Sequence, residues 1–339
     1  MTRYRLILIS MTLAALVVAC GGDNEADDTT GTVGTSRPPT STTVPATTTT
    51  EPPSQIEELE YPVSDEWVVE TVVRGIDGGT GGLAVDDEGV IFMGDFGYTT
   101  NRGDGIYRIT PDGDVEVFSN ADRMDQLTTT KIGPDGTLYQ SSYGSNLVFR
   151  IDENGEAAVV TDDILGPTGI VALEDGTLIV ASWSQGIIHR VLPDGTVEDW
   201  VERHPAFNGI NSLTMGPDGT VYVVNIRDGG LFAVDPDGSV SELHFFPRAN
   251  SHVAYHEGSL FVTSRGGYVI FRYYLATGEF EIVAGNGEPG DADGRGIESS
   301  FGRPNAITVG PEGALYFNHT EGTNDTPVQI KKITHQPEG

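Results

Sequence analysis

The stretch NAITVGPEGALYFN, residues Asn305–Asn318, decides the fold of this chain. Apolar and polar residues alternate on both sides of a Pro-Glu-Gly turn, and alternation with period two places one face of each strand in a core. Proline fixes φ at the start of the turn, and glycine supplies the positive-φ position that the turn needs. The stretch therefore predicts a β-hairpin.

The same hairpin occurs six times along the chain. The turn glycines of the six copies are Gly89, Gly136, Gly176, Gly219, Gly258 and Gly313. Successive turn glycines are 47, 40, 43, 39 and 55 residues apart, and in the first five copies a second hairpin turn follows each first one. Four strands per repeat at this spacing are typical of a β-propeller blade. The sequence therefore predicts an all-β fold, a six-bladed β-propeller with four-stranded blades.

The sixth copy ends one strand short. Its third strand is predicted at Val328–Ile333, and no fourth strand follows. The apolar segment Trp67–Val73 precedes the first copy and has no partner within it. We expect this N-terminal strand to complete the last blade and close the ring, since an open blade would leave an unpaired strand edge.

The start of the chain predicts export and lipid attachment. Arg3 and Arg5 precede an apolar run at Leu6–Ala19, which is typical of a signal peptide. The sequence Val-Val-Ala-Cys that ends at Cys20 resembles a bacterial lipobox, which implies a lipid on Cys20. Cys20 is the one cysteine of the chain, so disulfides, cysteine catalysis and a cysteine zinc site are excluded. The predicted location is the cell envelope, on the outer side of a bacterial membrane.

Three segments are predicted. Residues 1–20 form the signal peptide, residues 21–62 a disordered linker rich in Thr, Pro and Asp, and residues 63–339 the propeller. The formal net charge of −31 argues against nucleic-acid binding and against docking on anionic lipid through a basic surface. We expect a monomer held at the membrane by its lipid.

The sharpest family signal lies between residues 284 and 318. The segments AGNGEPGDADG (Ala284–Gly294), FGRPNAI (Phe301–Ile307) and GPEGALYF (Gly310–Phe317) resemble an NHL repeat. The weaker copies are similar to the six-bladed propellers of the SMP-30/gluconolactonase and virginiamycin-lyase families. These families include lactonases, lyases and binding platforms, so the resemblance implies the fold and leaves the function open.

One face of the propeller is expected to carry the function. The A→B and C→D turns are short and regular, whereas the loops on the opposite face are long and irregular. The longest are Asp95–Asp104 in blade one, His319–Pro327 in blade six, and Gly285–Pro304 between blades five and six. Blades six and one are neighbours in a closed ring, so these loops are expected to gather beside the mouth of the channel.

Two rings of polar positions are predicted around this mouth, at the ends of the B strands and at the starts of the A strands. The resemblance to metal-dependent lactonases implies a calcium or magnesium ion held there by carboxylate and amide oxygens. The predicted ligands are Asp95, Asn211, Asn225 and Asn305. Gly81 stands where this family has an acid in blade one, which argues against a complete lactonase site. Alternatively, the asparagines make hydrogen bonds that cap strand ends.

Two histidines near the mouth, His252 and His319, are candidate general bases. A lyase resembling virginiamycin lyase would use such a histidine beside a metal. The recurring His-Gly-Ile signature of that family is absent, and blade three has Thr-Gly-Ile at Thr168–Ile170. The alternative is that both are ordinary polar residues at strand ends.

Aromatic and arginine side chains in the irregular loops are candidate ligand contacts, because such groups are enriched in binding surfaces. They are Tyr98, Arg102, Tyr143, Trp183, Arg227 and Arg265. Ordinary loop packing is the alternative.

Two functions therefore remain open. The first is a membrane-anchored extracytoplasmic propeller that binds a protein, a glycan or a small molecule. The second is a divalent-metal-dependent hydrolase, gluconolactonase-like, or a virginiamycin-lyase-like enzyme.

Overall fold

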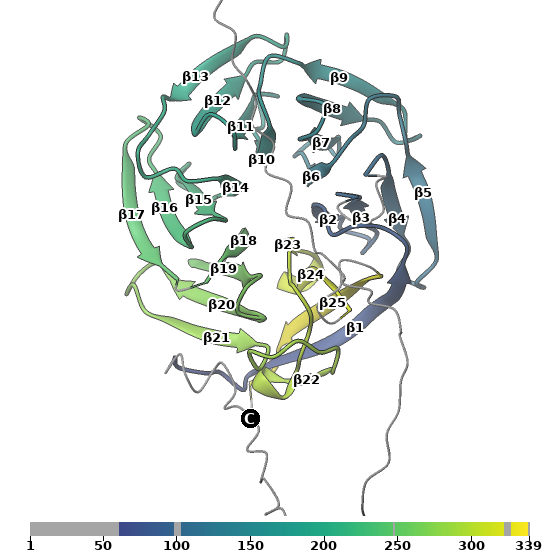
Figure 1. Ribbon diagram of the computed structural model, residues 1–339, viewed down its shortest axis with the longest axis vertical. Coiled ribbons are helices and arrows are strands. Elements are labelled where there is room, and N and C mark those ends of the chain that lie inside the picture. Colours follow the sequence, from purple (N-terminus) through teal and green to yellow (C-terminus); the bar gives the residue numbers. More distant parts are fainter. Residues whose placement is uncertain (1–60, 98–102, 247, 322–326, 338–339) are drawn as a thin grey trace, which may run out of the picture. The chain divides into compact units, whose positions relative to one another are not determined.

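The computed structural model describes residues 61–97, 103–246, 248–321 and 327–337. Six antiparallel sheets are arranged around a common axis, each with its first strand innermost (Figure 1). This confirms the six-bladed β-propeller predicted from the repeats. In the described part of the chain, no helix has the length and hydrophobicity needed to span a bilayer.

Blades one to five each contain four strands in chain order, from the inside to the outside. Blade one contains β2 (Leu83–Val85), β3 (Ile91–Gly94), β4 (Ile106–Ile109) and β5 (Val115–Ser119). Blade two contains β6 (Leu127–Ile132), β7 (Leu138–Ser142), β8 (Leu147–Ile151) and β9 (Ala157–Thr161). Blade three contains β10 (Pro167–Ala172), β11 (Leu178–Ser182), β12 (Ile187–Val191) and β13 (Val197–Val201). Blade four contains β14 (Ile210–Met215), β15 (Val221–Asn225), β16 (Gly230–Val234) and β17 (Val240–Phe245). Blade five contains β18 (Asn250–His256), β19 (Ser259–Ser264), β20 (Val269–Tyr274) and β21 (Phe280–Ala284).

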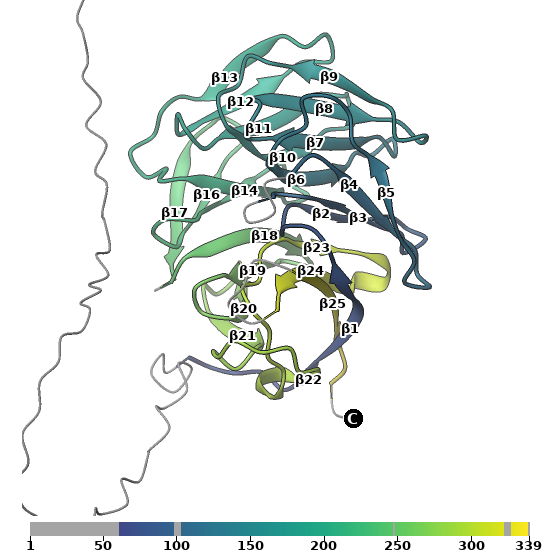
Figure 2. The same ribbon diagram turned by 45° about the vertical axis from the view of Figure 1, so that its right-hand side comes forward.

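Blade six joins the two ends of the described chain. Its order is β23 (Ile307–Val309), β24 (Leu315–Thr320), β25 (Val328–His335), β1 (Trp67–Ile76) and β22 (Gly294–Arg295). Strand β1 pairs antiparallel with β25, with Val68 opposite Thr334 and Glu70 opposite Lys332. The predicted closure by the N-terminal strand is therefore confirmed, and Figure 2 shows β1 beside β25. The short β22, with the 3₁₀ turn Gly296–Glu298, was not predicted; it comes from the long insertion and pairs with the outer edge of β1.

Apolar side chains between neighbouring blades form the core, and the ring closure is part of it. Trp67 of β1 is buried and packs edge-to-face on Phe261 of blade five, with ring centroids 5.3 Å apart. Phe301 of the insertion packs on Phe317 of β24 at 4.8 Å. The insertion that borders the loop face is thus anchored by its own aromatic residue.

A buried lysine ties the same elements together. Lys331 of β25 donates to Asp293 Oδ1 (2.6 Å) and to Thr71 Oγ1 of β1 (2.9 Å). Arg74 of β1 pairs with Asp291 at 2.8 Å. The acidic insertion, the N-terminal strand and β25 therefore form one connected unit beside blade one.

Candidate functional site

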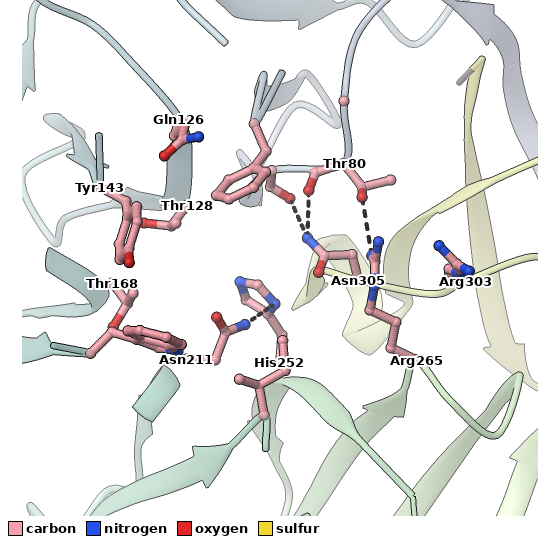
Figure 3. Close-up of a pocket in the computed structure, with 15 residues that line it drawn as sticks. Thr80, Gln126, Thr128, Tyr143, Thr168, Asn211, His252, Arg265, Arg303 and Asn305 are labelled. Carbon is pink, nitrogen blue, oxygen red and sulfur yellow. Dashed lines mark hydrogen bonds between the residues drawn. The ribbon is translucent and has the colours of Figure 1, made fainter. Parts of the chain in front are cut away.

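A cavity of about 560 Å³ opens on the irregular-loop face at the axis of the propeller (Figure 3). Side chains from all six blades and their loops contribute to its wall. The lining residues are Gly79, Thr80, Gly81, Phe96, Gln126, Thr128, Tyr143, Thr168, Trp183, Asn211, Ile226, His252, Arg265, Arg303 and Asn305. Its position agrees with the face that the loop lengths predict.

The upper wall comes from one repeat position in five blades, one or two residues after the end of the B strand. These residues are Phe96, Tyr143, Trp183, Ile226 and Arg265. Each lies seven residues after the turn glycine of its blade. Phe96 and Ile226 were not among the predicted site residues, although the repeat register contains the signal that would have found them.

One side of the wall is aromatic. Tyr143 and Trp183 meet edge-to-face with ring centroids 5.8 Å apart and an interplanar angle of 90°. The guanidinium of Arg227 lies 4.3 Å from the centroid of the Trp183 ring. Arg227 is not itself a lining residue, so it holds Trp183 in place by a cation–π contact. Tyr143 and Trp183, two of the predicted ligand contacts, line the cavity, whereas Arg227, a third, contacts Trp183 and does not line it.

The opposite side of the wall is cationic. In Figure 3, Arg265 and Arg303 lie across the cavity from Tyr143 and Thr168. Arg265 Nη1 donates to Thr80 Oγ1 (3.4 Å), and both arginines also interact with other residues of the chain. No carboxylate is found among the described residues of the wall. The cavity is therefore a locally positive region in a chain whose net charge is −31.

The lower wall is a ring of polar side chains from the innermost strands, and these side chains connect neighbouring blades. Thr128 of blade two donates to the carbonyl of Pro167 in blade three (3.1 Å). Thr168 of blade three donates to the carbonyl of Ile210 in blade four (2.8 Å). Both hydroxyls are thus used to hold one blade to the next.

The ring continues through the two asparagines that were predicted as metal ligands. Asn211 Nδ2 donates to the carbonyl of Ser251 in blade five (2.8 Å), and the hydroxyl of Ser251 donates to Asn305 Oδ1. Asn305 Nδ2 donates to the carbonyls of Thr80 (2.7 Å) and Gly81 (3.2 Å) in blade one. Both amides lie at the cavity as predicted, but their hydrogen bonds connect blades, which matches the alternative of strand-end capping.

Blade one has no side chain in this ring. A Cβ atom at Gly81 would lie 2.2 Å from the carbonyl oxygen of Gly94 and 2.3 Å from that of Leu127. Leu127 is the residue that corresponds to Pro167 and Ile210 in the other links. The backbone of blade one thus occupies the space that a side chain fills elsewhere, which explains the glycine at a position where the lactonase resemblance led us to expect an acid.

The residues at the B-strand ends form a second ring, which stabilises the loops. Asp95 Oδ1 accepts hydrogen bonds from the backbone N–H groups of Gly79 (2.6 Å) and Gly97 (2.7 Å). Burial raises the pKa of Asp95, and these backbone hydrogen bonds partly offset that shift. Asn225 Nδ2 donates to the carbonyl of Ala206 (2.8 Å). Neither residue lines the cavity, so both belong to the loop scaffold.

His319 occupies the same ring position in blade six. It is fully buried, packs against Phe301 and Phe317 with tilted rings, and its Nδ1 lies 3.2 Å from the backbone nitrogen of Gly302. Burial lowers the pKa of His319 to about 4. The imidazole of His319 does not line the cavity, so its position does not support the predicted role as a general base.

His252 does line the cavity. Its Nδ1 is 3.5 Å from Asn211 Nδ2 and 3.3 Å from Ser251 Oγ, whereas no hydrogen-bond partner of Nε2 is found among the described residues. Burial lowers the pKa of His252 to about 4. The imidazole is therefore neutral at pH 7, and a group with so low a pKa is a weak general base.

The predicted metal ligands do not fit a hard divalent cation. Such an ion takes oxygen ligands, with carboxylates supplying most of the affinity. Asp95 is the one carboxylate of the predicted set, and its Oδ1 already accepts two backbone hydrogen bonds away from the cavity. The described residues contain no group of three His, Cys, Asp or Glu able to hold a metal. The predicted contacts Tyr98 and Arg102, and Cys20, lie outside the described residues.

Comparison with known proteins agrees with this architecture. No family model matches the chain. It is 26% identical to virginiamycin B lyase of Nocardia farcinica over 248 residues, which cover 72% of this chain and 78% of that protein. Both of the families that the sequence resembles are found among its structural neighbours.

The first neighbour is a catalytically inactive histidine-to-alanine variant of virginiamycin B lyase from Staphylococcus aureus with quinupristin (TM-score 0.56, 17% identity, 79% of this chain and 99% of that one). The second is a gluconolactonase from Xanthomonas campestris (TM-score 0.59, 15% identity, 78% and 88%). These likenesses show the fold.

Proposed function

We propose that the protein binds a small amphipathic molecule in this cavity, and that it does so outside a bacterial membrane to which Cys20 anchors it. The ligand class has an aromatic or apolar part and an anionic or strongly accepting group. The observation that carries this proposal is the division of the wall, with Tyr143 and Trp183 on one side and Arg265 and Arg303 on the other.

The dimensions and the chemistry of the wall support binding. A volume of about 560 Å³ falls in the range of small-molecule sites, which is roughly 300–1,000 Å³. The edge-to-face pair of Tyr143 and Trp183 is a rigid apolar surface, because Arg227 holds the indole from behind. Arginine donates to carboxylate and phosphate groups in a planar, two-pronged geometry. A ligand with both features would contact the two sides together.

The hydrogen bonds of the lower wall favour binding over chemistry. Asn211, Asn305, Thr128 and Thr168 donate hydrogen bonds to the next blade, so these side chains act as structural links and their protons are already used. His252 is the one titratable residue of the described lower wall, and its pKa of about 4 makes it a weak base. The cavity is thus better equipped to hold a molecule than to transform it.

The test uses the three tryptophans of the chain as reporters. A panel of aromatic carboxylates is titrated against the purified propeller, and quenching of tryptophan fluorescence is followed. We expect Trp183→Ala to abolish the signal and Arg265→Gln to weaken binding by about ten- to hundredfold, since a charge-assisted hydrogen bond contributes about 1.5–3 kcal/mol. Trp200→Phe is the matched control, because Trp200 lies on the outer strand β13. Quenching that survives in Trp183→Ala but is lost in Trp200→Phe would contradict the proposal.

A second candidate is lyase activity, favoured by the identity with virginiamycin B lyase and by His252 in the cavity wall. The chain and quinupristin are incubated with and without magnesium, and the loss of quinupristin is followed by liquid chromatography. Consumption that His252→Ala abolishes would support the lyase. If the wild type does not consume quinupristin and a panel member quenches its fluorescence in a saturable way, the result would favour binding over lyase activity.

A further inference from the structure

A second cavity, of about 240 Å³, lies along the axis between the innermost strands of all six blades. It shares His252 with the cavity at the mouth. Its other lining residues are Gly82, Leu83, Thr129, Thr130, Lys131, Ile170, Val171, Ala172, Ser212, Leu213, Thr214, Met215, Val253, Ala254, Tyr255, Ile307, Thr308 and Val309. The wall thus combines aliphatic side chains with hydroxyl groups.

Lys131 is the one lysine or arginine of this wall, and the described wall contains no carboxylate. The side chain belongs to β6, and burial lowers its pKa. No ion pair or hydrogen bond to Lys131 Nζ is found among the described residues. Lys131 is partly buried, and an ammonium group in such a place gains from an anionic partner.

A hydroxyl group without a hydrogen-bond partner among the described residues lies in the wall of the same cavity. Thr129 lines the cavity, is 7% exposed, and its Oγ1 has no hydrogen-bond partner among the described residues. Thr129 and Lys131 both line this cavity and are two residues apart on β6, so one small group at this wall can contact both side chains.

Two further hydroxyls of the wall have protons to donate. Ser212 Oγ accepts a hydrogen bond from the backbone of Val253 (3.4 Å), and Thr214 Oγ1 accepts one from the backbone of Tyr255 (3.1 Å). Because each hydroxyl acts as an acceptor toward the neighbouring blade, its own O–H remains able to donate into the channel. The wall therefore offers one ammonium group and several hydroxyl donors.

We propose that the channel binds a small oxyanion, with Lys131 as its cationic contact and Thr129 as a hydroxyl donor. This site is separate from the cavity at the mouth, whose cations are Arg265 and Arg303. The bound anion would give Thr129 the hydrogen-bond partner that is missing among the described residues, and it would pair with the partly buried ammonium group of Lys131.

Inorganic phosphate is the probe, and the lysine content makes the readout specific. The chain has three lysines, Lys131, Lys331 and Lys332. The native protein is treated with an amine-acylating reagent at increasing phosphate concentration, and the rate at each lysine is followed by mass spectrometry. We expect phosphate at about ten times its dissociation constant to slow acylation of Lys131 by about tenfold, because only about a tenth of the sites then remain free, and to leave Lys332 unchanged.

Three variants locate the site. Lys131→Met keeps most of the apolar stem and should abolish the phosphate-dependent rise in melting temperature; its melting curve without phosphate shows whether it folds. Thr129→Val should weaken phosphate binding, and Arg265→Gln should leave it unchanged. Protection of Lys131 that is absent at millimolar phosphate would overturn the proposal. A phosphate effect that Arg265→Gln removes and Lys131→Met retains would also overturn it, because the anion would then bind at the mouth.

Discussion

Replacing Thr168 by valine removes one hydroxyl from the inner ring and keeps the shape of the side chain. Thr168 is 1% exposed, and its Oγ1 donates to the carbonyl of Ile210 at 2.8 Å, so the change breaks one link between blades three and four. A hydrogen bond contributes about 1 kcal/mol net, and a buried acceptor left unpaired raises the cost to as much as about 3 kcal/mol. We expect Thr168→Val to lower the free energy of unfolding by about 1–3 kcal/mol in urea denaturation at pH 7.

The control is Thr129→Val, which makes the same chemical change one blade away. The Thr129 hydroxyl has no partner among the described residues, so its removal should leave stability in phosphate-free buffer unchanged or slightly higher. Comparing the two variants removes the effects that any Thr→Val change has on stability, such as the difference in strand propensity. If Thr168→Val is as stable as the wild type, or if both variants lose the same free energy, the ring does not hold the blades together.

Three further predictions address closure, pH and anchoring. Trp67→Ala should cost about 3–5 kcal/mol in thermal unfolding, because the indole is buried against Phe261; a small loss would contradict closure by β1. Burial lowers the pKa of His319 to about 4, so between about pH 6.5 and pH 4 the unfolded chain binds a proton that the folded chain does not. The stability from neutral His319 is therefore complete above pH 6.5 and lost as pH falls toward 4, and His319→Gln should flatten this slope in urea midpoints measured across that range. Cys20→Ser should release the protein from the membrane fraction; unchanged partition and mass would exclude lipid attachment.

The propeller could be predicted from sequence because its signals are local and repeated. Alternation with period two and a glycine turn every 39–55 residues identify the hairpins, and six copies leave little choice of architecture. The closing strand could be predicted because Trp67–Val73 had no partner in its own repeat. Strand β22 could not, because it has two residues, Gly294 and Arg295, and it depends on the contacts of the insertion with Lys331 and Phe317.

The candidate site was predicted in part. The position count located Asn211, Asn305 and His252 at the cavity, but it placed Asp95 and Asn225 there as well. For the positions on the innermost strands, alternation alone does not give the direction of the side chains, because these strands are irregular near the mouth. The pairing of β10 with β11 shifts register between Pro167 and Ile170, and β6, β14 and β18 have shifts at the corresponding place. A bulge changes which way the following side chains point, and no single-residue pattern in the sequence marks it.

The arrangement separates the residues that hold the fold from those that can change without breaking it. At the ends of four B strands the side chains of Asp95, Ser142, Ser182 and Asn225 make hydrogen bonds to loops, and the second residue of most A strands makes one to the next blade. Both positions are therefore restricted to side chains that can make those hydrogen bonds. The residue seven positions after the turn glycine differs from blade to blade in the aromatic half of the wall, where it is Phe96, Tyr143, Trp183 or Ile226. Four positions that face one cavity and differ from blade to blade would allow the same propeller to hold different ligands. The ligand of this chain is therefore to be sought through these wall residues, with Asn211 and Asn305 serving as the frame.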